Sequence, residues 1–155
     1  MSAPLWTCDD LILACNGTLF DPNVAHTTIS GIQIDSRKCG SGDLFVALAG
    51  DKRDGHDFLV KAANAGAAAC LVSCPQRDLS TIQIIVDDTF AGLARLAAAG
   101  RSRFKGRMVG ITGSVGKTGT KSMLAHALTN FGTTHASKQS YNNHIGVPVT
   151  LSTLP

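Results

Sequence analysis

Short runs of hydrophobic residues divide the first hundred positions into segments with the length of buried strands. Residues 44–48 (Leu-Phe-Val-Ala-Leu) form an unbroken apolar run between a Gly-containing turn and a polar loop bounded by Gly. An uninterrupted apolar run of this length is typical of a strand buried on both faces of a parallel sheet. Similar short segments predict further strands at 32–34, 68–72 and 82–86.

The segments between these strands carry hydrophobic residues at helical spacing. Thr7 can cap a helix over residues 8–15. A second helix is expected before Gly66, which stops it, and a third begins at Asp87 or Asp88 and carries its apolar face as far as Phe104. Strands that alternate with helices indicate an α/β domain.

A second unit follows a basic connecting stretch, residues 101–107. Met108–Ile111 is a short apolar segment that predicts a strand, and it leads into the Gly-rich run 112–118. A helix is expected next, because five hydrophobic residues share one helical face; they are Met123, Leu124, Ala127, Leu128 and Phe131. Strand, Gly-rich loop and helix in this order are the context of a phosphate-binding loop.

Charge is distributed unevenly between the two units. All eleven acidic residues are Asp, the last of them is Asp88, and eight of the fourteen Lys and Arg residues follow it. A basic second half could bind nucleic acid, but it has few aromatic residues and a phosphate-binding loop accounts for its charge. We therefore expect no nucleic-acid partner.

Other classes of protein are disfavoured by hydropathy and cysteine content. The longest apolar run, Ala65–Val72, is far shorter than the roughly 20 residues of a membrane span. The first ten residues lack the features of a secretory signal, and five cysteines without such a signal suggest free thiols. The sequence predicts a cytoplasmic protein without a membrane span.

The Gly-rich run has the chemistry that phosphate binding requires. Glycines allow the backbone N–H groups and the helix N-terminus to approach an anion closely. Lys117 would reach the β- and γ-phosphates of ATP, and the hydroxyl of Thr118 would bind Mg²⁺. Ile111 stands where the strict pattern requires its first Gly, so the match is to the shorter segment Gly113–Thr118.

The absence of carboxylates after Asp88 bears on the second unit. Mg²⁺ in ATP sites is usually held by one or two carboxylates together with phosphate oxygens. Only 49 residues follow residue 106, enough for one strand, loop and helix. We therefore divide the chain into an α/β domain, 1–106, and the incomplete start of a parallel-sheet ATP-binding domain, 107–155.

Three segments resemble the Mur ligase superfamily, the ATP-dependent amide ligases of peptidoglycan synthesis. They occur in the family's order and read IDSRKCGSGDLFVALAGDKRDGHDF, ITGSVGKTGTKSML and SYNNHIGVPVTL. The family's form of the ATP loop lacks the first Gly. The resemblance covers about residues 29–154 and implies an N-terminal UDP-binding α/β domain followed by an ATPase domain.

The resemblance also implies roles for particular residues. Ser36 and Arg37 fall where the family holds the UDP part of its substrate, although they also fit a solvated strand end with an Asp35–Arg37 ion pair. Asn142 and Asn143 fall near the ATP phosphates and the reacting carboxylate, although they also fit a turn before Ile145. The ATP-binding residues implied are Gly113, Ser114, Val115, Gly116, Lys117, Thr118 and Gly119, of which Gly119 departs from the usual Thr or Ser.

The reaction implied is ATP-dependent amide formation through an acyl phosphate, with Lys117 and Asn143 as the catalytic residues. The Asn-Asn segment favours the branch of the family that adds D-alanyl-D-alanine to UDP-N-acetylmuramoyl-tripeptide. This chain is expected to be inactive alone, and the rest of the ligase or another chain would complete the ATPase domain. Two alternatives remain open: a non-catalytic module that binds a UDP-sugar or a partner, and a ligase that adds the third amino acid.

Overall fold

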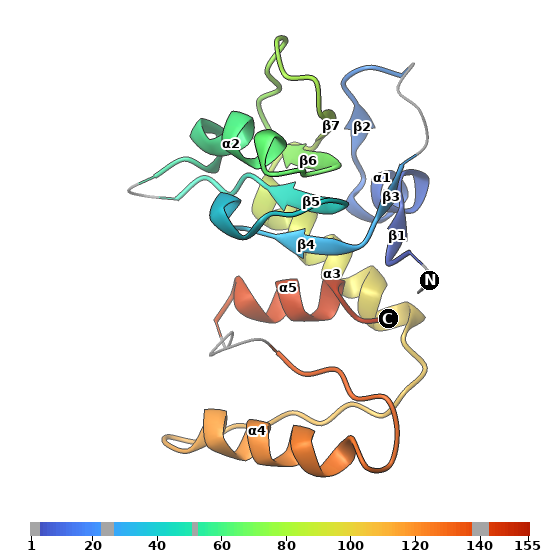
Figure 1. The fold of residues 1–155 in the computed structure, drawn as a ribbon, viewed down its shortest axis with the longest axis vertical. Helices are drawn as coiled ribbons and strands as arrows, with labels where there is room; N and C mark the ends of the chain where they lie inside the picture. The colour runs from blue at the N-terminus through green and yellow to red at the C-terminus, as the bar shows by residue number, and fades with distance from the viewer. Residues whose placement is uncertain (1–3, 23–26, 51–52, 138–142) are drawn as a thin grey trace.

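The computed structural model describes residues 4–22, 27–50, 53–137 and 143–155. A five-stranded sheet forms the centre of the fold, in the order β2-β7-β6-β5-β4 (Figure 1). The four parallel strands are β4 (Gly31–Gln33), β5 (Asp43–Val46), β6 (Ala69–Val72) and β7 (Ile82–Ile85), and β2 (Thr18–Leu19) pairs antiparallel with β7. All four strands predicted from apolar runs are confirmed.

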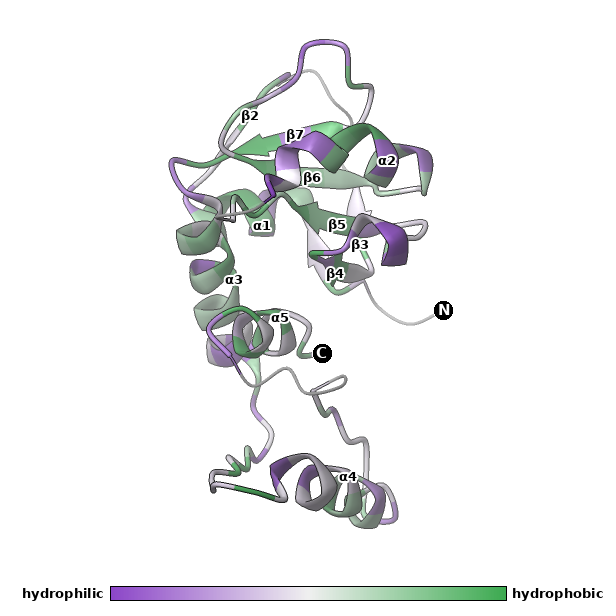
Figure 2. Ribbon diagram, turned by 90° about the vertical axis from the view of Figure 1, so that its left-hand side faces the viewer, coloured by the Kyte–Doolittle hydropathy of each residue, from purple (hydrophilic) through white to green (hydrophobic). Residues whose placement is uncertain are grey.

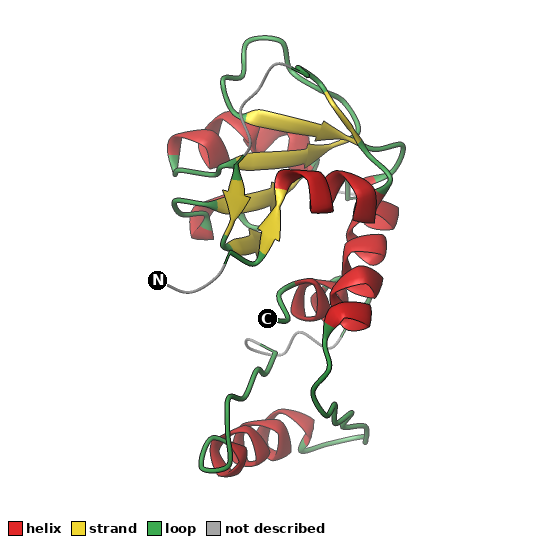
Figure 3. Ribbon diagram, turned by 90° about the vertical axis from the view of Figure 1, so that its right-hand side faces the viewer, coloured by secondary structure: helices red, strands yellow, loops and turns green. Residues whose placement is uncertain are grey.

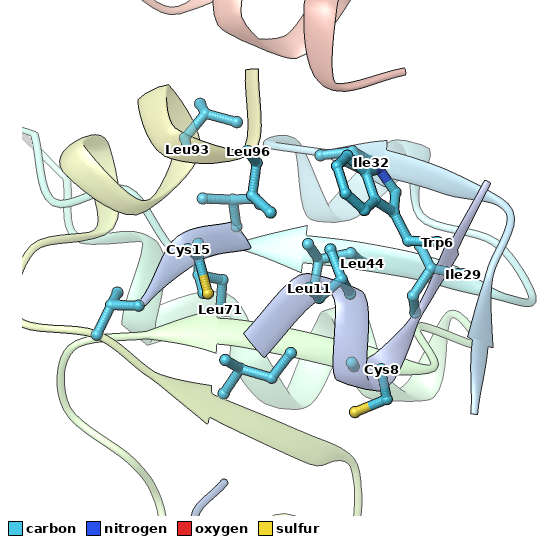
Figure 4. Packing of buried hydrophobic residues seen from close by; sticks show 14 of the residues in the cluster. Trp6, Cys8, Leu11, Cys15, Ile29, Ile32, Leu44, Leu71, Leu93 and Leu96 are labelled. Atoms are coloured by element: carbon cyan, nitrogen blue, oxygen red, sulfur yellow. The ribbon is translucent and has the colours of Figure 1, made fainter. Parts of the chain in front are cut away.

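Alternate residues of the central strands belong to two separate cores. On β5, Leu44 and Val46 join the larger cluster, while Phe45 joins the smaller cluster on the other face. The larger core is covered by α1 (Cys8–Cys15) and α3 (Thr89–Arg103), and Figure 4 shows Leu11 and Leu96 of these helices beside Leu44. Burial on both faces is the reason that β5 and β6 read as unbroken apolar runs.

Helix ends follow the local chemistry of the sequence. The Thr7 hydroxyl accepts a hydrogen bond from the Asp10 N–H and caps α1, and Asn16 ends that helix in the left-handed conformation at φ 56°. The Asp88 carboxylate caps α3 by accepting the Ala91 N–H at 2.7 Å. On the smaller core, α2 (Leu59–Asn64) follows the short 3-10 helix η2 (Gly55–Phe58).

Several short elements were not predicted from the pattern, among them β2 and η2. β1 (Trp6–Thr7) and β3 (Thr28–Ile29) pair antiparallel, and a 3-10 helix, η1 (Ser36–Lys38), follows β4. Two-residue strands are too short to show a period of two, so the sequence carried no signal for them.

The second half of the chain contains α4 (Lys117–Leu128) and α5 (Gly146–Ser152). The strand predicted at Met108–Ile111 is wrong: this segment has no strand partner in the described part of the chain, and Met108 and Val109 are exposed. A parallel strand needs a neighbour to satisfy its backbone groups. The face of α4 with Met123 is also exposed, and Figure 2 shows α4 away from the sheet.

α5 packs against α3 rather than against α4. Val149 belongs to the larger core, and Gly100 of α3 lies so close to α5 that an added Cβ would come within 2.4 Å of the Leu151 carbonyl oxygen. Figure 3 shows α5 beside the end of α3, between the sheet and α4. The division at residue 106 therefore remains a prediction, and residues 146–154 contact the first unit.

No helix among the described residues combines the length and the apolar character that crossing a membrane requires.

We expect Gly100→Ala to loosen α5 from α3 and to lower the free energy of unfolding by about 1–3 kcal/mol, because the new methyl group meets backbone. Urea unfolding would measure this change. Gly119→Ala in α4 is the matched control, since nothing lies within 4 Å of its added Cβ. The control should not destabilise the chain, and equal losses in both variants would contradict the packing argument.

Candidate functional site

The Gly-rich loop ends at the N-terminus of α4, as the sequence predicts. Gly113 and Gly116 have φ values of +145° and +82°, which only Gly adopts without strain. Gly116 is the N-cap residue, and within the described chain no side chain caps this helix. N–H groups in the first turn of a helix have no acceptor within the helix, so this end of α4 favours an anion.

Lys117 lies folded over the loop. Its Nζ donates to the Gly113 carbonyl and lies 3.5 Å from the carbonyl oxygen of Ser114. The Thr118 carbonyl accepts the Ser122 hydroxyl at 3.0 Å, and Thr118 is exposed in the first turn of α4. Lys117 and Thr118 are thus brought to one end of α4, beside the loop glycines.

A cavity of about 940 Å³ separates α4 from α5. Gly113, Lys117 and Thr118 line it from the loop, and Val147 and Leu151 line it from α5. Three of the seven residues predicted to bind ATP therefore face a cavity that also borders α5.

Asn143 lies at the start of α5 and acts there as a turn residue. Its Oδ1 accepts the N–H of Ile145 at 3.2 Å and that of Gly146 at 2.7 Å. The next ring, His144, stacks on Phe90 of α3 at 6.2 Å between centroids. The turn interpretation of Asn143 is confirmed, its phosphate contact stays a prediction, and Asn142 lies outside the described residues.

Ser36 and Arg37 lie just beyond the carboxyl end of β4, in η1. Ser36 is buried, whereas the Arg37 guanidinium is exposed. Arg37 forms a bidentate ion pair with Asp35, with Nε–Oδ1 at 2.9 Å and Nη2–Oδ2 at 2.8 Å. Hydrogen bonding from Arg37 lowers the pKa of Asp35 to about 2. Ligands of parallel sheets bind at the carboxyl ends of strands, so this position suits the predicted UDP contact.

His56, in η2, binds the backbone just after the carboxyl end of β6. Its Nε2 accepts the backbone N–H groups of Ser73 at 3.0 Å and Cys74 at 3.3 Å, which places the ring proton on Nδ1, 2.6 Å from Asp54 Oδ1. Backbone and side-chain hydrogen bonds from His56 lower the pKa of Asp54. The Ser73 hydroxyl lies 3.3 Å from Nε2, but two amides share that lone pair, so His56 is a structural acceptor rather than a base.

The ligands for Mg²⁺ are incomplete in this chain. Among the described residues there is no group of three or more His, Cys, Asp or Glu side chains that could hold a metal. Thr118, in the first turn of α4, is the residue predicted to supply a hydroxyl oxygen to Mg²⁺, and no Asp or Glu follows Asp88 in the sequence. A Mg²⁺ ion beside the loop, with Thr118 as one of its ligands, stays a prediction.

From the sequence, Arg103 was only part of the basic stretch that connects the two units, residues 101–107. Its guanidinium stacks over the Trp6 ring at 3.7 Å and donates to the carbonyls of Leu5 and Leu154, both at 2.7 Å. These partners lie about 50 and 100 positions away in the chain, so no local spacing could have shown them.

The Asp35–Arg37 pair predicts a weakening of the fold in acid. The folded pKa of Asp35 lies below its ordinary value of 3.8, so the pair's contribution is complete above about pH 4 and is lost as the pH falls towards 2. In urea unfolding measured across pH, Asp35→Asn should reduce this fall in the free energy of unfolding between about pH 4 and 2. Arg37→Gln keeps the backbone N–H bond to Asp35 and should reduce this fall only in part. If both variants lose as much stability in acid as the parent chain, the pair does not stabilise the fold.

His56→Ala should lower the free energy of unfolding by about 2–4 kcal/mol, because it leaves the amides of Ser73 and Cys74 without their acceptor. Urea unfolding measures the loss. His126→Ala, on the exposed surface of α4, is the control and should stay within about 0.5 kcal/mol of the parent chain. Similar values for the two variants would contradict the structural role of His56.

Comparison with protein families matches both parts of the chain. Residues 28–102 match the catalytic domain of the Mur ligase family, and residues 111–155 match the Mur ligase middle domain. The UDP-N-acetylmuramoyl-tripeptide–D-alanyl-D-alanine ligase of Synechocystis is 45% identical over 125 residues, covering 79% of this chain and 28% of that protein. The ligase of the same name from Bacillus subtilis is 40% identical over 141 residues, covering 90% of this chain and 31% of that protein. The chain therefore spans less than a third of the length of these relatives.

Solved structures share the fold. A UDP-N-acetylmuramoylalanyl-D-glutamyl-2,6-diaminopimelate–D-alanyl-D-alanyl ligase from Acinetobacter baumannii superposes with a TM-score of 0.85 at 34% identity, over 100% of this chain and 35% of that one. The MurF ligase from Thermotoga maritima, solved with ADP, gives a TM-score of 0.62 at 32% identity over 79% of this chain and 28% of that one. Two domain models of one family, matched in order, together with these structures show that the chain belongs to the Mur ligase family.

Proposed function

We propose that this chain carries the UDP-substrate domain and the ATP loop of a ligase that joins D-alanyl-D-alanine to UDP-N-acetylmuramoyl-tripeptide. The curated relatives bear that name, and they match both the sheet domain and the loop segment. The ligase that adds the third amino acid is the weaker candidate, because none of the relatives compared above bears its name.

The loop at the start of α4 is the observation that carries the proposal. It combines two glycines at positive φ, a helix N-terminus without a side-chain cap in the described chain, and Lys117 beside them. This arrangement suits the phosphates of ATP, since backbone N–H groups and a lysine supply positive charge without steric obstruction. The relative from Thermotoga maritima was solved with ADP, which agrees with a nucleotide as ligand.

The chain's own residues would then act by binding and orientation. Lys117 would leave the loop carbonyls that it now contacts and stabilise negative charge on the transferred phosphoryl group. Thr118 would supply one ligand to Mg²⁺, which neutralises phosphate charge when bound. The Asn143 segment would lie near the phosphates and the substrate carboxylate that becomes the acyl phosphate.

The sheet domain would hold the distant UDP group. Ser36 and Arg37 lie where the carboxyl ends of parallel strands present loops to a ligand. Binding energy from this remote part of the substrate would place its reacting carboxylate at the ATP site. The exposed Arg37 fork, now paired with Asp35, is suited to a diphosphate because guanidinium binds phosphate oxygens in pairs.

Lys117→Met should weaken ADP binding by at least about tenfold, because it removes the positive charge beside the loop. Isothermal titration calorimetry on the 155-residue chain measures this affinity. Lys105→Met, in the connection before the loop, is matched in charge and should bind ADP as the parent chain does. No ADP binding by the folded parent chain, or equal weakening by both variants, would contradict the ATP site.

The UDP site is tested separately with UDP-N-acetylmuramoyl-tripeptide in the same calorimeter. Arg37→Met should weaken binding of this ligand and leave ADP binding unchanged, because the two sites lie on different elements. A folded chain that shows no heat with the UDP ligand would remove the proposed substrate domain. Binding of the UDP ligand without any ADP binding would instead favour the non-catalytic UDP-sugar module.

A further inference from the structure

Arg103 links three segments that are distant in the sequence. It is the last residue of α3, and its two Nη atoms donate to the carbonyls of Leu5, before β1, and Leu154, after α5. The indole of Trp6 lies under the guanidinium at 3.7 Å and donates its own N–H to the Ser152 carbonyl at 2.8 Å. The C-terminal end of α5 is therefore held by two side-chain hydrogen bonds.

Only arginine provides this set of interactions. Its planar fork donates in two directions at once while its face stacks on an aromatic ring, whereas the lysine ammonium is a single point charge. The position also suits a cation, since the C-terminus of α3 carries partial negative charge. Arg103 Nε is buried without a hydrogen-bond partner in the described chain. Burying the guanidinium therefore costs solvation free energy, because this N–H loses its hydrogen bond to water.

Further contacts run along α5 towards its N-terminus. Gly100 lies against the backbone of Leu151, and Phe90 stacks on His144. Early residues of α3 meet the start of the α5 segment and late residues meet its end, so the two helices run in the same general direction. α5 is a single seven-residue helix, and its position is set along its length by α3.

Asn143 depends on the position of this helix. Its side chain accepts the N–H groups of Ile145 and Gly146, so it moves with the first turn of α5. The anchor at the other end of that helix is the Arg103 contact with Leu154. A group at the end of α3 is thereby connected to the residue predicted to approach the nucleotide phosphates.

We propose that Arg103 is a positioning residue: by clamping α5 to α3 and Trp6, it places Asn143 for its contact with bound nucleotide. The inference rests on the proposed function, because Asn143 is a candidate only if the loop of α4 binds ATP. Arg103 itself is not among the described residues that line the cavity beside the loop. Its effect reaches the site through α5, from the domain that would hold the UDP group.

Amide hydrogen exchange of the 155-residue chain tests the clamp without any ligand. Arg103→Met keeps an unbranched side chain of similar bulk but removes the guanidinium that stacks on Trp6 and donates to Leu5 and Leu154. It should raise exchange at Ile145, Gly146 and Val149 by about tenfold while strands β5 and β6 stay protected. Arg103→Lys should restore only part of this protection. Arg101→Met, whose parent side chain reaches only the nearby Phe104 carbonyl, is the control and should leave exchange as in the parent.

Trp6 provides a second readout, because it is the only tryptophan in the chain. Its emission should shift in Arg103→Met and remain unchanged in Arg101→Met, since only Arg103 stacks on the ring. A uniform rise in exchange over all elements would mean that Arg103 serves global stability alone. That result, or no change at α5, would overturn the proposal.

Adding ADP separates this inference from the proposed function. In the parent chain ADP should slow exchange both at the loop, residues 113–118, and at Asn143–Gly146; in Arg103→Met it should slow exchange at the loop alone. Protection of both segments in the variant, or of the loop alone in the parent, overturns the positioning role and leaves the ATP site intact. Protection of neither segment in the parent overturns the ATP site, and the positioning role with it.

Discussion

Burial of β5 and β6 on both faces is the constraint on which the rest of the fold depends. Each of these strands gives alternate side chains to two cores, so helices must cover both faces of the sheet. Parallel strands in turn require crossover connections, and their carboxyl ends meet at one edge. The Asp35–Arg37 pair and the His56 network lie at that edge. The same constraint therefore builds the core and gathers the polar loops that could bind a substrate.

The contact between α3 and α5 joins the two parts of the chain. α5 follows the nucleotide loop in sequence, yet it packs on the helix that completes the sheet domain. The cost of close backbone approach is avoided by Gly100, and the buried Arg103 charge is stabilised by carbonyl groups and the Trp6 ring. In the segment after α4, the Ser137 carbonyl accepts a hydrogen bond from Lys121 of α4, and the His135 ring lies 3.3 Å from the Thr150 carbonyl of α5. α5 is consequently the element through which the loop half contacts the sheet half.

The two halves of the chain also differ in the charge of their side chains. Every acidic residue lies at or before Asp88, and three of them act locally. Asp35, Asp54 and Asp88 cap η1, η2 and α3, and the first two also pair with Arg37 and His56. The second half offers an open helix N-terminus, Lys117 and no acid. Such a surface favours polyanions.

The sequence by itself determined the features that depend on neighbouring residues. The apolar runs specified the four parallel strands, Thr7 and Asp88 specified helix starts, and the Gly-rich loop with Lys117 specified a phosphate-binding candidate, because periodicity, capping and loop chemistry are local. Tertiary structure decided the rest. Met108–Ile111 forms no strand because pairing needs a neighbour, Asn143 turns its oxygen to the amides of α5, and Arg103 finds partners at Leu5 and Leu154. Contacts between residues far apart in the chain leave no mark on local spacing, so only the folded chain could bring them together.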